Sequence, residues 1–116
     1  MTSRDFRRIA LGMTGAVEGA HMGHPDFRAN GRIFATLSPD PAWGCVVRLT
    51  PEQQRELVEA DPATFVPAKG AWGRAGATMV RLASADGDTV GEAMTLAWQA
   101  TLKIAKPKAK RKKAPR

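Results

Sequence analysis

The chain has 116 residues, with 18 Lys and Arg side chains against 11 Asp and Glu side chains, and its formal net charge is +7. Eight of the basic residues and none of the acidic ones fall in residues 103–116, so this segment carries +8 and the other 102 residues carry −1. The high net charge is therefore a property of the C-terminal tail, and it does not indicate a basic surface on the rest of the chain.

The length fits one domain with a single hydrophobic core and excludes a second domain. Cys45 is the only cysteine, which excludes an intramolecular disulfide and favours a reducing compartment. No apolar run approaches the roughly 18 to 20 residues of a membrane span, and the first residues lack the apolar stretch of a signal peptide. We expect a cytoplasmic protein with one domain over residues 1–102 and no membrane contact.

The N-terminal half predicts one helix and three strands. Thr2 and Ser3 can cap a helix that ends near Gly12, and apolar residues then repeat at helical spacing. Residues 18–28 are read as one strand. The pair Asn30-Gly31 is typical of a tight hairpin, and it precedes a β-branched and aromatic strand over residues 32–37. After a turn with two prolines, residues 43–49 predict a further strand with Cys45, Val47 and Leu49 on one face.

The C-terminal half predicts two helices and two strands. The run Thr50-Pro51-Glu52-Gln53 is typical of a helix start, and this helix ends at Asp61-Pro62. Residues 65–66 suggest a short strand, residues 69–76 a glycine-rich loop, and residues 77–83 a strand. A last helix, capped by residues 86–89, has one apolar stripe that includes Trp98 and Leu102.

The element order is α-β-β-β-α-β-β-α, without sustained strand-helix-strand alternation. This order predicts the α+β class: a two-layer α/β sandwich with an antiparallel sheet of about five strands and helices on one face.

Several short motifs, taken in order, resemble the MmcQ/YjbR-like family. They are His24-Pro25-Asp26-Phe27-Arg28, the strand 31–37, Val47-Arg48-Leu49 before the Thr-Pro-Glu-Gln helix, and Gly70-Ala71-Trp72-Gly73 before Val80-Arg81-Leu82. The resemblance covers about residues 3–102 and leaves out the tail. It implies a two-layer α/β domain with an antiparallel sheet. It also implies DNA binding, because the fold is similar to a double-wing DNA-binding domain of a phage transcription factor, which is an analogy of fold.

The tail over residues 103–116 predicts a disordered, extended segment, because closely spaced cations and prolines cannot bury a core. Such a segment favours contacts with the phosphates of DNA that do not depend on sequence, and its lack of aromatic residues gives no support for base stacking. A solvated extension with no selected role is the alternative. The tail residues that we expect to contact phosphate are Lys106, Lys108, Lys110, Arg111, Lys112 and Lys113.

Residues 1–102 are called the body below. Five arginines lie on or beside its predicted strands and would form a compact patch if they shared the open face of the sheet. Arginine suits bidentate contacts with phosphate or guanine, whereas pairing with acids across the sheet would make the same residues structural. The five residues are Arg28, Arg32, Arg48, Arg74 and Arg81.

Other residue clusters give weaker signals. His21, His24 and Asp26 could supply metal ligands, but residues three apart on one strand point to opposite faces, so we predict no metal. His24 and Trp72 are candidate ligand contacts, and Trp72 could equally pin its loop onto the sheet. Cys45 is expected to be a buried, inert thiol.

The sequence shows no enzyme constellation and no phosphate-binding loop, and we expect neither a catalytic activity nor a cofactor. It predicts a DNA-binding protein of the family type. The alternative is a module that binds a small molecule or a protein through the open sheet face near Trp72, Arg74, His24 and Arg28.

Overall fold

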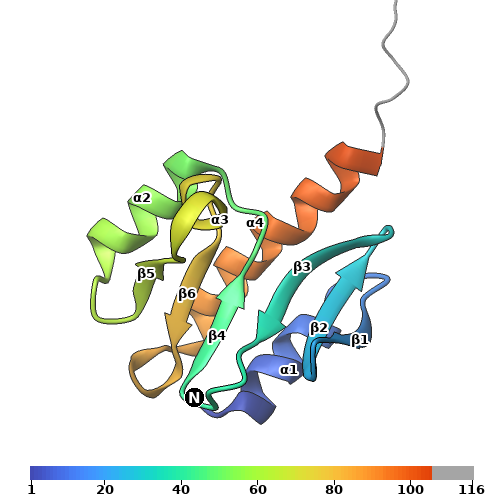
Figure 1. Cartoon of the computed structure of the whole chain (residues 1–116), viewed down its shortest axis with the longest axis horizontal. Coiled ribbons are helices and arrows are strands. Elements are labelled where there is room, and N and C mark those ends of the chain that lie inside the picture. The colour runs from blue at the N-terminus through green and yellow to red at the C-terminus, as the bar shows by residue number, and fades with distance from the viewer. Residues whose placement is uncertain (106–116) are drawn as a thin grey trace, which may run out of the picture.

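A six-stranded antiparallel sheet with the strand order β1-β2-β3-β4-β6-β5 forms the centre of the computed structural model, which describes residues 1–105, with side chains as far as Leu102 (Figure 1). Every neighbouring pair of strands runs antiparallel, so the predicted α+β class is confirmed. The strands are β1 (Val17–His21), β2 (His24–Ala29), β3 (Arg32–Leu37), β4 (Trp43–Val46), β5 (Phe65–Pro67) and β6 (Thr78–Arg81).

The helices begin where the sequence offers capping side chains. Thr2 and Thr50 each accept a hydrogen bond from the backbone N–H three residues later, and Asp5 and Gln53 reach back to the cap in return. Both capping boxes lie where the sequence predicts helix starts. The helices are α1 (Ser3–Leu11), α2 (Pro51–Ala60), α3 (Gly70–Arg74) and α4 (Gly87–Ala105), with a 3₁₀ turn at Leu82–Ser84.

Helices α1 and α4 cover one face of the sheet and enclose the main core. In Figure 1 both helices lie behind the strands, and α4 crosses behind β4 and β6. The buried aromatic rings of this core belong to Phe6, Phe27, Phe34 and Phe65, and α4 adds Val90, Met94 and Ala97. The apolar stripe of α4 ends before Leu102, which is 38% exposed, whereas Trp98 is half-buried against the core.

The stretch 18–28 forms two strands instead of the single strand that its residues predict. Met22 and Gly23 both adopt positive φ, at 51° and 85°, and reverse the chain between β1 and β2. His21 then pairs with His24 across the hairpin. The sheet therefore has six strands, and the element order is α-β-β-β-β-α-β-α-β-α.

The glycine-rich segment 69–76 is also more regular than a loop, because it contains the one-turn helix α3. Gly73 faces the backbone of Ala68 so closely that a β-carbon there would lie 1.6 Å from the Ala68 carbonyl oxygen. Gln54 of α2 donates hydrogen bonds of 2.8 Å to the carbonyls of Gly73 and Ala77. Gly73 is needed here for close approach, which spacing alone did not reveal.

A second, smaller apolar cluster lies on the other side of the sheet. Cys45, Ala68 and Ala77 are buried there, and Val47 and Met79 pack against them. Leu49, which the sequence places with Cys45, belongs to the main core instead, because β4 ends at Val46 and strict alternation ends with it. In the described part of the chain, no helix is long and apolar enough to cross a membrane.

Candidate nucleic-acid interface

The face of the sheet opposite α1 and α4, called the open face below, follows from the strand register. Gly44 lies under the ring of Phe6 on α1, so Gly44 and its cross-strand partners Leu37 and Val80 face the helices. The alternate residues point the other way. Those that lie on the open face are Val17, Gly19, His21, His24, Asp26, Arg28, Ile33, Thr36, Trp43, Cys45, Val66, Met79 and Arg81.

Asp26 is the one acidic strand residue on the open face, and its charge is already matched. It is fully buried, and Arg28 donates to both of its oxygens, with Nε to Oδ1 at 2.7 Å and Nη2 to Oδ2 at 3.0 Å. His21 Nδ1 lies 2.7 Å from Oδ2. These hydrogen bonds, that from Arg28 foremost, lower the pKa of Asp26 to about 2 against the opposing effect of burial. Arg28 is therefore the partner of a buried carboxylate.

Arg32 and Arg48 lie together at the end of the sheet where β2 turns into β3. Arg48 follows β4, and its Nε donates a 2.8 Å hydrogen bond to the carbonyl of Ile33. Burial, helped by the nearby positive charge of Arg32, lowers the pKa of Arg48. Arg32 is exposed and pairs with Ala29, which places it on the helix side of the hairpin. The two residues form a local pair of cations, which we call the arginine pair.

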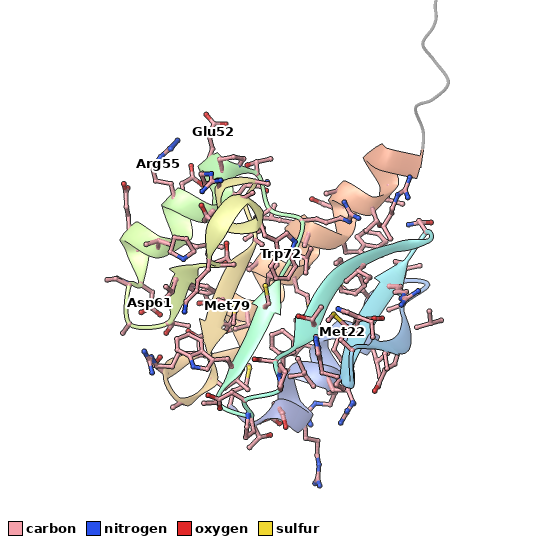
Figure 2. The ribbon with its side chains drawn as sticks, viewed as in Figure 1. Met22, Glu52, Arg55, Asp61, Trp72 and Met79 are labelled. Carbon is pink, nitrogen blue, oxygen red and sulfur yellow. The ribbon has the colours of Figure 1, made fainter. Side chains whose placement is uncertain are left out.

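Trp72 extends this region toward α3. It is 49% exposed and lines a groove of about 300 Å³ together with Val47, Arg48 and Ala100. In Figure 2 the Trp72 side chain lies at the centre of the molecule, below α3. Half of the indole is exposed, so an aromatic surface borders Arg48 of the arginine pair.

The other two arginines lie apart from this pair. The guanidinium of Arg81 stacks on the ring of Trp43, 4.5 Å from its centroid, at the opposite end of β4 from Arg48. Arg74 is exposed on α3, two residues after Trp72. The five arginines thus do not form one compact patch on the open face, because only Arg28 and Arg81 point from strands to that face.

The arginine pair lies at the end of the molecule from which the basic tail continues. Asn30, at the tip of the β2–β3 hairpin, donates a 3.1 Å hydrogen bond to Thr101 near the end of α4. Figure 1 shows the C-terminal end of α4 beside this hairpin. The tail cations from Lys106 to Lys113 lie outside the described residues; near the described end of α4, Thr101 bonds to the hairpin that carries Arg32, and Ala100 lines one groove with Arg48.

The two histidines lie closer together than the sequence suggests. The β1–β2 hairpin places His21 and His24 on the same face, with ring centroids 4.6 Å apart. The argument that residues three apart diverge fails here, because the chain reverses between them. Even so, the described residues contain no group of three or more His, Cys, Asp or Glu side chains that could hold a metal ion.

Cys45 is buried, as predicted, and burial raises the pKa of its thiol to about 12. A buried thiol whose pKa is raised is a poor nucleophile at neutral pH.

The open face also carries a groove that the sequence did not predict, at the end of β4 that begins with Trp43. Trp43, Val66, Pro67, Lys69 and Met79 line it. The alternation along residues 77–83 could have indicated this groove, because Met79 is apolar although it points away from the helix layer. A second apolar residue on that face, Trp43, would have marked the same region.

The fold and the site define a small α+β domain with an open sheet face and a cluster of cations at one end. A family model described as YjbR matches residues 11–100, and the chain belongs to the YjbR family. The crystal structure of Deinococcus radiodurans protein DR2400, described as having a DUF419 domain, is similar to this chain with a TM-score of 0.68 at 18% identity. The match covers 96% of this chain and 83% of that one, and it shows the fold alone. No curated protein matches the chain.

Proposed function

We propose that this protein is a non-enzymatic DNA-binding protein that contacts phosphates without reading sequence. The observation that carries the proposal is the position of the arginine pair beside the end of α4, where the chain enters a segment with eight basic residues and no acidic one. Body and tail cations can therefore contact one stretch of duplex.

The local chemistry of the arginine pair supports this role. Arg32 is exposed, and in Arg48 the Nε is used for the Ile33 carbonyl, which leaves the terminal N–H groups as donors for phosphate oxygens. Trp72 beside them adds an exposed aromatic surface. By contrast, Arg28 is held by Asp26 and is a poor candidate for phosphate binding.

The salt dependence of binding tests the proposal. Full-length protein is titrated against a fluorescently labelled duplex of 20 base pairs at several salt concentrations. With five or six phosphate contacts, log K should fall with log salt at a slope of about −5, or roughly 10³-fold between 50 and 200 mM. A scrambled duplex should bind equally well, since phosphate contacts carry no base information.

A tail variant separates the two contributions. Replacing all eight basic residues of residues 103–116 by glutamine keeps the length of the chain and removes every basic side chain from this segment. Binding that weakens but keeps a slope near −1 to −2 supports a contribution from the body. If the full-length protein shows no salt-sensitive binding, the proposal is wrong; if the tail variant loses all binding, the body has no part in it.

A further inference from the structure

The groove beside Trp43 and Met79 on the open face has the size and lining of a small ligand site. Its volume is about 360 Å³, within the range of roughly 300 to 1,000 Å³ typical of small-molecule pockets. Val66 of β5 lies directly opposite Met79 of β6, and Trp43 of β4 lies diagonally from Met79. Figure 2 shows Met79 on the face turned to the viewer. Three neighbouring strands thus supply an apolar floor.

This floor stays uncovered because the second apolar cluster fills only the neighbouring part of the face. The cluster buries Cys45, Ala68 and Ala77 but leaves Met79 partly exposed at its border. Val66 is 37% exposed on the edge strand of the sheet. Neighbouring apolar residues that keep part of their surface in solvent mark binding sites more often than isolated ones do.

The one charged residue that lines the groove is a cation. Lys69 is exposed and lines the groove, and the guanidinium of Arg81 lies on the ring of Trp43. None of the lining residues is acidic. The groove therefore combines apolar walls with cations at its border, which is complementary to an apolar molecule that carries one negative charge.

We propose that this groove binds a small carboxylic acid with an apolar or aromatic body. The body lies against Trp43, Met79 and Val66, and the carboxylate is paired with the ammonium group of Lys69. Arg81, whose guanidinium lies 4.5 Å from the centroid of the Trp43 ring, adds positive potential. The site is separate from the proposed DNA contact, because Trp43 and Arg48 lie at opposite ends of the strand and its continuation.

Three probes with one body and different head groups test the site on the full chain without DNA. They are 4-phenylbutyrate, 4-phenylbutanol and 4-phenylbutylamine, which carry negative, zero and positive charge. The readouts are the indole N–H resonances of the three tryptophans and the methyl resonances of methionine. For a probe of about a dozen heavy atoms, the acid should bind with a Kd on the order of 1 mM. Only Trp43 and Met79 should shift, and the alcohol and the amine should bind about tenfold more weakly.

A charge reversal at the border tests the role of Lys69. Lys69→Glu should weaken the acid about tenfold or more and make the amine the better ligand. Arg74→Glu, an exposed cation on α3 that does not line the groove, is the matched control and should leave the affinity for the acid unchanged. The backbone amide spectrum of each variant shows whether the protein is folded.

Three results would overturn the proposal. Equal affinities for the three probes would mean apolar adsorption without charge recognition. Shifts at Trp72 or Trp98 instead of Trp43 would place the probe elsewhere. Shifts at Trp43 that depend on protein concentration without any probe would identify the groove as a contact between two copies of the chain. The duplex titration is independent, since the acid at saturation should leave the Kd for DNA unchanged.

Discussion

Gly44 on β4 lies directly beneath the ring of Phe6 on α1, and a β-carbon at Gly44 would come within 2.7 Å of Cε2 of that ring. Both residues are buried, and Phe6 is one of the largest fully buried side chains. The close approach of α1 to the sheet therefore depends on the absence of a side chain at position 44.

Gly44→Ala should lower the free energy of unfolding by about 1 to 3 kcal/mol, because Phe6 must shift in a packed core. Gly91→Ala is the matched control, since a β-carbon at Gly91 meets nothing within 4 Å and lies in α4. It should stabilise the protein by up to about 1 kcal/mol. Chemical denaturation measures both changes. A Gly44→Ala protein as stable as the parent would show that α1 does not pack on β4 as described.

The buried carboxylate of Asp26 should make the protein sensitive to acid. Its pKa in the folded state is about 2, below the ordinary value of 3.8, so its contribution is present above about pH 4 and is lost as the pH falls toward 2. The contribution amounts to no more than about 2 kcal/mol, because Arg28 is partly exposed to solvent. Asp26→Asn should remove this pH dependence between 4 and 2, and denaturation at a series of pH values tests it. If the free energy of unfolding changed equally with pH in the parent and the variant, the role of the carboxylate would be contradicted.

The arginine pair gives a prediction for the body alone. Arg32→Glu should weaken DNA binding by roughly eightfold at 0.1 M salt and reduce the salt slope by about 1, as expected for one lost phosphate contact. Arg4→Glu makes the same charge change at an exposed arginine of α1, outside the arginine pair, and serves as the control. Comparable losses in the two variants would show that net charge alone, and no defined body surface, sets the affinity.

Cys45 should react with thiol reagents only when the protein unfolds. Burial and a pKa of about 12 together reduce the thiolate accessible at pH 8 by at least about 10³-fold relative to a free thiol. A colorimetric thiol assay with and without denaturant measures this ratio. Fast reaction of the folded protein would mean that the cluster around Cys45 opens readily.

The sequence predicted the elements whose signals are local. Both capping boxes, the Asn30-Gly31 hairpin and the strands around residues 32–37 and 78–81 depend on side chains within a few residues of each other. The turn at Met22-Gly23 was missed because methionine at positive φ is rare and carries no turn signal. The short helix α3 was missed because closely spaced glycines indicate a loop, and the sequence does not show that Gly73 packs against the backbone of Ala68.

The candidate sites depend on which face of the sheet a residue occupies, and the sequence constrains this only in part. Phe34 is an extra residue in β3, since Ala35 opposes Phe27 while Ile33 opposes Arg28. This irregularity changes which arginines share a face. Arg28 pairs with Asp26, two residues earlier on the same face of β2, and not with an acid across the sheet.

The hydrogen bond from Arg48 to Ile33 extends the pairing between β3 and β4 by one step. The backbone pairing of β3 with β4 continues as far as the bond from Val47 N–H to Phe34 O, and at the next step a side chain takes the place of the backbone donor. A phosphate held by the terminal N–H groups of Arg48 leaves this bond in place, because Nε and the terminal nitrogens are separate donors of one guanidinium. One side chain therefore serves both the edge of the strand pairing and the basic end of the molecule.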